Sequence, residues 1–153
     1  EWEWGKPSYS GVYGEPLTCN PGSAYGCWVT DLSGTYNASS SQDLTSIVIN
    51  IPLTATTPIS VSWYQALYIE KSLYDHASAS YRCNDGVWQS TWVYSSSTNV
   101  FQNWQLAPGA PYSTTCAPGD TLELQFHLDS DSSVQYAGYY IDDVRVFDGL
   151  NRT

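Results

Sequence analysis

Hydrophobic and polar residues alternate with a period of two along most of the chain, and segments 59–69 and 122–128 show this most clearly. One side of these segments carries Ile59, Val61, Trp63, Leu67 and Ile69, and then Leu122, Leu124, Phe126 and Leu128. This period is typical of β-strands that bury one face and expose the other. No stretch shows the 3.6-residue apolar spacing of an amphipathic helix. The pattern therefore predicts an all-β protein.

Further strands are expected where shorter apolar runs are separated by Gly, Pro, Asn and Asp turn residues. These strands are predicted at 45–52, 77–84, 87–94, 100–106 and 138–147. Short strands at this spacing are typical of a two-sheet β-sandwich, and we expect jelly-roll connections between them. A length of 153 residues fits one such domain, covering residues 1–153.

The acidic composition limits the classes of partner. The formal net charge is −10, from 15 acidic and five basic residues, so the chain repels nucleic acids and anionic membranes. It has no apolar run of about 18 residues and no N-terminal targeting pattern. Since it also lacks methionine, we expect a monomeric module excised from a larger secreted protein.

Four cysteines, at positions 19, 27, 83 and 116, lack the C-x-x-C spacing of zinc and redox sites. An even number in a Tyr- and Ser-rich chain indicates two disulfides formed in an oxidising compartment. Three pairings are possible. We favour Cys19–Cys27, which closes a local loop, together with Cys83–Cys116, which closes a long one.

Two adjacent acids, Asp142 and Asp143, interrupt the apolar strand predicted at 138–147. Neighbouring residues of a strand point to opposite faces, so one of the two must point inward. Asp142 shares its parity with Tyr140 and Val144 and is predicted to be the inward one. A buried carboxylate is costly unless a cation or hydrogen bonds compensate it.

Calcium is a natural compensating cation, because basic side chains are scarce here and calcium binds hard oxygen ligands. Glu3 is a second acid in an apolar setting, between Trp2 and Trp4. If the first and last strands are neighbours, Glu3 and Asp142 could share one ion. The alternative is that each merely accepts hydrogen bonds at a strand end.

Several motifs, in order along nearly the whole chain, resemble a jelly-roll domain of secreted bacterial peptidases. They are Trp2-Glu3-Trp4-Gly5, Cys27 to Asn37, Leu44-Thr45-Ser46, Ser62-Trp63-Tyr64, Tyr74-Asp75, Asn84 to Trp88, Trp104, Leu124-Gln125-Phe126 and Tyr140 to Val144. Related patterns occur in immune inhibitor A-type metallopeptidases and in the cleaved adhesin domains of gingipains. The segment 9–25 has no counterpart there, and we expect this insertion to cover a binding face.

This resemblance implies an ancillary domain with a structural calcium ion. The first-strand Glu and last-strand Asp resemble calcium ligands of MAM-like domains and carbohydrate-binding modules, which assigns Glu3 and Asp142. Asp31 and Asp43 flank the loop expected to approach this site and are added as candidate ligands.

Aromatic residues are unusually frequent, with seven Trp and 13 Tyr. Trp88, Trp92 and Tyr94 share one parity of a predicted strand, and an aligned row of rings could stack on sugars. The alternative is that this aromatic face is the core face of the strand.

Catalytic motifs are absent from the sequence. The chain has only two histidines, His76 and His127, and contains no nucleophile elbow or zinc-peptidase motif. The pair Asp129 and Asp131 lies in a serine-rich turn that does not frame a substrate. We therefore expect a non-catalytic, calcium-binding extracellular module that attaches a secreted hydrolase to carbohydrate or glycoprotein. The alternative is a structural or interaction domain of a secreted peptidase, with no ligand beyond calcium.

Overall fold

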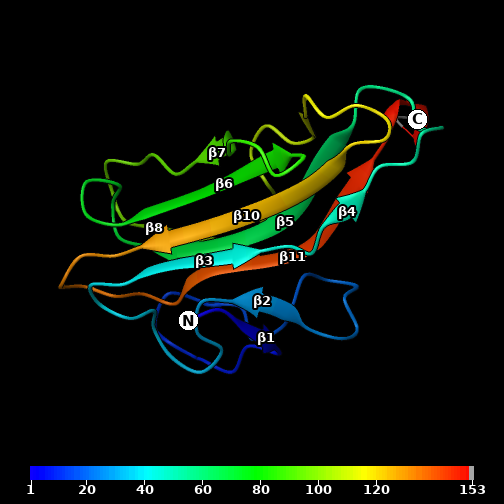
Figure 1. The fold of residues 1–153 in the computed structure, drawn as a ribbon. Coiled ribbons are helices and arrows are strands. Elements are labelled where there is room, and N and C mark those ends of the chain that lie inside the picture. Colours follow the sequence, from blue (N-terminus) through cyan, green and yellow to red (C-terminus); the bar gives the residue numbers. More distant parts are fainter. Residues whose placement is uncertain (152–153) are drawn as a thin grey trace.

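Two antiparallel sheets form the fold of the computed structural model, which describes residues 1–151 (Figure 1). The six-stranded sheet has the order β1 (Glu3–Gly5), β2 (Cys27–Val29), β11 (Gly138–Phe147), β5 (Ser60–Ile69) and β8 (Val100–Leu106), and β9 (Tyr112–Ser113) also pairs with β5. The five-stranded sheet has the order β3 (Ser41–Thr45), β10 (Thr121–Asp129), β6 (His76–Cys83) and β7 (Gln89–Val93), and β4 (Ile49–Asn50) also pairs with β10. A short 3₁₀ helix, η1 (Gly149–Asn151), follows β11.

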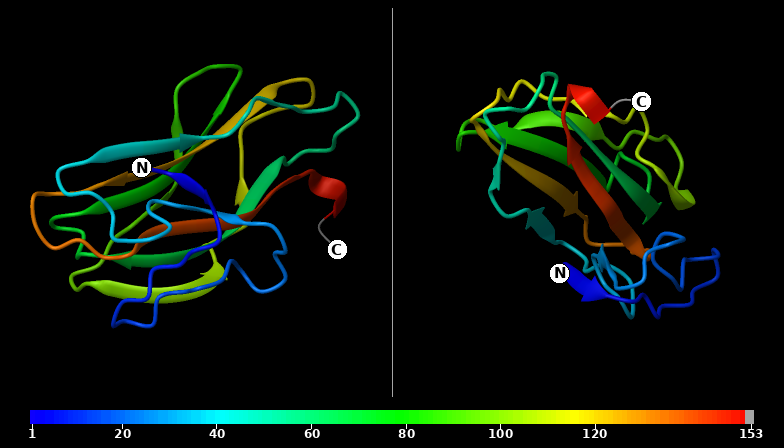
Figure 2. Two further views of the ribbon diagram at one scale, coloured as in Figure 1. Left: turned by 90° about the horizontal axis from the view of Figure 1, so that it is seen from below. Right: turned by 90° about the vertical axis from the view of Figure 1, so that its right-hand side faces the viewer.

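The two sheets pack face to face, so the all-β class and the two-sheet sandwich predicted from the sequence are confirmed. The jelly-roll connectivity stays a prediction. Figure 2 shows the two layers from other directions. The expected strand at 45–52 differs, because Ser46 leaves the regular pairing and its hydroxyl accepts a hydrogen bond from the Leu124 N–H at 2.9 Å. That region consequently contains two strands, β3 and β4, on either side of a break.

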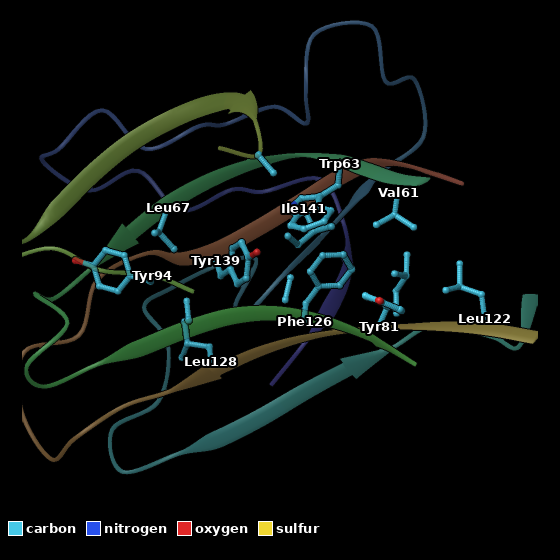
Figure 3. Packing of buried hydrophobic residues seen from close by; sticks show 14 of the residues in the cluster. Val61, Trp63, Leu67, Tyr81, Tyr94, Leu122, Phe126, Leu128, Tyr139 and Ile141 are labelled. Atoms are coloured by element: carbon cyan, nitrogen blue, oxygen red, sulfur yellow. The ribbon is translucent and has the colours of Figure 1, made fainter. Parts of the chain in front are cut away.

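The main core lies between the sheets and contains the apolar sides of β5 and β10 (Figure 3). Leu122, Leu124, Phe126 and Leu128 are all buried, as their alternation predicts. The Trp63 indole donates a hydrogen bond to Gln65 Oε1 at 2.8 Å, so even the polar residue inside this layer has a partner. The alternation of β10 is therefore a true inside–outside pattern.

A second, smaller core lies on the outer face of the six-stranded sheet. The N-terminal segment, blue in Figure 1, lies on the side of β11 away from β10 and covers Tyr68 and Tyr140 there. It is held by hydrogen bonds from the Tyr68 hydroxyl to the Gly14 carbonyl at 2.9 Å and from the Trp104 indole to the Thr18 carbonyl at 2.9 Å. The segment 9–25 thus covers the outer face of the six-stranded sheet, and its expected role over a binding face stays a prediction.

Gly138 allows β11 to begin close to this covering layer. Its φ of +101° is unfavourable for other residues, and an added Cβ would lie 2.0 Å from the Thr30 hydroxyl oxygen. The same hydroxyl accepts a hydrogen bond from the Tyr139 N–H at 3.2 Å. A side chain at this position would therefore displace β11 from β2.

Candidate metal centre

Three acids meet at one end of the sandwich, on the left in Figure 1. Glu70 directly follows β5, Asp75 directly precedes β6, and Asp131 comes two residues after β10. One carboxylate oxygen from each lies within 4.8 Å of the other two. Because β5 belongs to one sheet and β6 and β10 belong to the other, the cluster joins the two layers.

Hydrogen bonds fix two of the three carboxylates. Asp75 is fully buried, and its two oxygens accept hydrogen bonds from the Tyr36 hydroxyl at 2.5 Å and from the Asp131 N–H at 2.9 Å. Asp131 accepts a hydrogen bond from the Ser133 N–H at 2.8 Å. The Tyr36 hydroxyl also accepts a hydrogen bond from the Glu70 N–H at 3.3 Å, which links the third acid to the same network.

Glu70 is the exception within the network. Its side chain is buried, with 7% of the residue exposed, and its Oε2 atom has no hydrogen-bond partner among the residues that the structure describes. A buried acceptor without a partner is costly, and more so when it is charged. Within residues 1–151, no ion pair with lysine or arginine involves any of these three acids. The cluster therefore concentrates negative charge without a protein cation in contact.

The electrostatics of the cluster follow from this arrangement. Burial, and then the charges of Asp75 and Asp131, raise the pKa of Glu70 against a smaller opposing effect of Lys71. Burial also raises the pKa of Asp75, outweighing the hydrogen bonds from Tyr36 and the Asp131 N–H. Burial and the adjacent Asp75 raise the pKa of Tyr36 in turn, so it remains a neutral donor. The charged form of the site is thus disfavoured in the metal-free protein.

The donor set fits a hard divalent cation. Calcium–oxygen distances are about 2.3–2.6 Å, so two ligands on opposite sides of one calcium ion are about 5 Å apart. The 4.8 Å limit on the spacing of the three oxygens is within this span. All three side-chain donors are carboxylates, whereas a zinc site would include nitrogen or sulfur.

The four acids predicted as calcium ligands are not brought together. Strand β2 lies between β1 and β11, so Glu3 and Asp142 are not on neighbouring strands. Glu3 is exposed and accepts a hydrogen bond from the Leu32 N–H at 2.8 Å. Asp31 accepts one from the Ser33 N–H at 2.8 Å, and Asp43 contacts His127 at 2.7 Å.

Asp142 is buried, but on the outer side of its sheet. Its two oxygens accept hydrogen bonds from the Asn20 N–H at 3.1 Å and the Asp143 N–H at 2.8 Å, so it anchors the N-terminal segment. It also lies near Cys19 and Cys27, whose sulfurs are joined in a disulfide and are not free to bind metal. Glu3 and Asp142 thus each accept backbone hydrogen bonds, which is the alternative to a shared ion.

The aromatic row is divided by a β-bulge. Pairing between β6 and β7 shifts by one residue at Thr91, which reverses the faces on its two sides. Tyr94 is buried in the main core and Trp92 packs against Tyr139, whereas Trp88 lies against Arg82, with 4.7 Å from the guanidinium to the ring centre. Figure 3 shows the Tyr94 ring among the core residues. The three rings therefore do not form one exposed row.

The sequence held one signal for the acidic cluster that the prediction did not use. Glu70 and Asp75 bracket the turn between two predicted strands, and Asp131 follows a third. In a sandwich whose neighbouring strands are antiparallel, a strand end and the next strand's start lie at the same edge. Acids at three such strand ends are therefore candidates to lie close together in the fold.

Both predicted disulfides are present, Cys19–Cys27 and Cys83–Cys116. They indicate an oxidising environment of the extracellular type. No helix in the part of the chain that the structure describes is long and apolar enough to cross a membrane.

These features define the class of the protein as a two-sheet antiparallel β-sandwich with two disulfides. A scan against models of known protein families and a search of curated proteins both find no match.

Proposed function

We propose that this chain is a non-catalytic extracellular module whose loop end is held in place by a calcium ion bound to Glu70, Asp75 and Asp131. The unpartnered, buried Oε2 atom of Glu70, beside two further carboxylates, is the observation that carries the proposal. A bound cation would supply the missing partner and neutralise the mutual repulsion. Backbone carbonyls and water would complete the usual six to eight ligands.

The proposed role of the ion is structural. Glu70 extends from the six-stranded sheet, and Asp75 and Asp131 extend from the five-stranded sheet, so their common ion would tie the two layers together. Tyr36 brings the loop between β2 and β3 into the same network through its bond to Asp75. A module stabilised in this way suits a structural or interaction domain of a larger secreted protein.

Calcium titration with thermal denaturation tests the proposal. Calcium at about 100 times its dissociation constant should stabilise the folded state by about 2.7 kcal/mol relative to the protein in chelator. Calorimetric titration should give one site per chain, and Asp131→Asn should weaken it. Glu3→Gln is the matched control, because Glu3 is exposed and distant in the sheet order from the cluster. The same melting temperature in calcium and in chelator would refute the proposal.

Carbohydrate binding is a second candidate, and the position of Trp88 favours it. The ring lies on the outer face of the five-stranded sheet with the Arg82 guanidinium over one side, and its other side is the one proposed to stack on a sugar. Retention of the module on immobilised polysaccharides, compared with Trp88→Ala, tests this role. Trp4→Ala is the control, since Trp4 is an exposed tryptophan of the other sheet that packs against Trp28. Equal retention of both variants would remove Trp88 from any sugar site.

A further inference from the structure

A chain of alternating carboxylates and imidazoles crosses the outer face of the five-stranded sheet. His127 on β10 contacts Asp43 on the edge strand β3, with 2.7 Å between Nδ1 and Oδ1. Its Nε2 atom is 3.2 Å from Asp129 Oδ2, and the other oxygen of Asp129 is 2.7 Å from His76 Nδ1 on β6. Both histidines of the chain therefore belong to one network that spans three strands.

The contacts of His127 favour its protonated form. A neutral imidazole has one donor nitrogen and one acceptor nitrogen, whereas ionised carboxylates only accept hydrogen bonds. Both nitrogens of His127 face a carboxylate oxygen, so a neutral ring would direct a lone pair at one of them. Only the imidazolium, which donates from both nitrogens, satisfies both contacts.

We propose that His127 is an imidazolium clamp that fastens the edge strand β3 to β10 and releases it when the ring loses its proton at higher pH. In the register of the sheet, His127 is directly opposite Asp43 on one side and Ser78 on the other. The titratable groups that face it are thus Asp43 from β3 and Asp129 from its own strand, with His76 from β6 acting through Asp129. None of these contacts involves Glu70, Asp75 or Asp131.

The electrostatic balance agrees with this geometry. Partial burial alone would lower the pKa of His127, but the hydrogen bonds and charges of Asp43 and Asp129 outweigh it and raise the pKa above 6.5. The ordinary histidine pKa of about 6.5 applies to the unfolded chain, so the stabilisation by the protonated ring is complete below this pH. It is lost as the pH rises through the higher pKa of His127 in the folded protein.

The clamp acts on an edge strand. Within residues 1–151, β3 pairs with no strand other than β10, so its other edge has no neighbouring strand there, although the Trp2 indole donates a hydrogen bond to the Gln42 carbonyl at 3.4 Å. Such edges open locally more easily than central strands and can pair with other chains. A pH-dependent clamp here would keep the edge closed in mildly acidic surroundings and loosen it in alkaline ones.

Hydrogen–deuterium exchange of residues 41–45, corrected for intrinsic rates and measured at pH 6 and pH 8.5, tests the clamp. Protection should be about two- to fivefold higher at pH 6, since partly exposed ion pairs contribute at this level. Ring ¹⁵N shifts of His127 should show both nitrogens protonated at pH 6. His127→Gln should abolish the pH dependence, whereas His76→Gln should retain it.

Two further measurements keep the outcome decisive. Asp43→Asn removes one carboxylate and should lower the titration midpoint of His127, which provides a test if His127→Gln does not fold. The exchange measurements are repeated in saturating calcium and in chelator. If the calcium proposal fails, protection is the same in calcium and in chelator, but the difference between pH 6 and pH 8.5 that tests the clamp remains. Equal protection at both pH values, wild-type pH dependence in His127→Gln, or pH dependence seen only in chelator would overturn the clamp.

Discussion

Replacing Glu70 by Gln should stabilise the calcium-free protein and weaken its stabilisation by calcium. In the calcium-free protein the substitution removes one charge from three carboxylates whose oxygens lie within 4.8 Å of one another. At 4.8 Å, each like-charge pair costs about 0.9 kcal/mol at a dielectric constant of 80 and about 3.5 kcal/mol at 20. Glu70 belongs to two of these pairs, so the variant should be more stable than the wild type by about 2 kcal/mol at the higher dielectric constant and by about 7 kcal/mol at the lower one. For a chain of this length, each kcal/mol raises the melting temperature by about 2–4 °C.

In calcium this advantage of the variant should shrink. The wild type gains about 2.7 kcal/mol at 100 times the dissociation constant. The Gln variant offers one charged ligand fewer, so at the same calcium concentration its gain should be a small part of this. Thermal denaturation of both proteins in chelator and in calcium measures this change, with Glu3→Gln as the control that follows the wild type in both. If Glu70→Gln is no more stable than the wild type in chelator, or gains as much from calcium, the reasoning about the cluster is refuted.

Two other predictions concern pH and the disulfides. The pKa values of Glu70 and Asp75 are raised above their ordinary 4.5 and 3.8, so the folded calcium-free protein binds more protons than the unfolded chain. Its stability in urea should then rise as the pH is lowered from 7 toward 5, and saturating calcium should suppress this trend; a calcium-free stability that falls over this range would contradict the assignment. The disulfides Cys83–Cys116 and Cys19–Cys27 span 33 and 8 positions, for which chain entropy gives about 3.7 and 2.5 kcal/mol. Replacing the Cys83–Cys116 pair by alanine should thus cost about 1 kcal/mol more in urea unfolding than replacing the other pair, and the reverse order would show that native contacts outweigh loop closure.

The sheet class could be predicted because period-two alternation records burial directly. In β10 every second residue is buried without interruption, and the pattern needs no knowledge of the neighbouring strands. The disulfide pairing was also accessible, because a short Pro- and Gly-rich loop favours local closure. Both inferences depend on residues that are close in the sequence or share a strand.

The faces of Asp142 and Trp88 could not be predicted by the same counting. Register between β11 and β5 shifts after Asp142, where Asp143 has a φ of +49°, and the shift reverses the faces of the residues that follow. Val146 therefore packs against the core, whereas Tyr140 and Asp142 lie under the N-terminal segment. A bulge adds one residue to a strand, so counting every second residue across it assigns the later side chains to the wrong face of the sheet.

The acidic cluster shows the same limit at a larger scale. Glu70, Asp75 and Asp131 converge because β5, β6 and β10 all begin or end at one edge, and two of these strands belong to a different sheet from the third. Along the sequence, each of these three acids lies beside the end of a different strand. Taken one at a time, each resembles an ordinary solvated acid at a strand end. Only the packing of the sheets buries Glu70 and removes the water that would otherwise bind its free oxygen. The need for a cation is therefore created by the tertiary structure, and in the proposed function the same ion would hold together the two layers that created it.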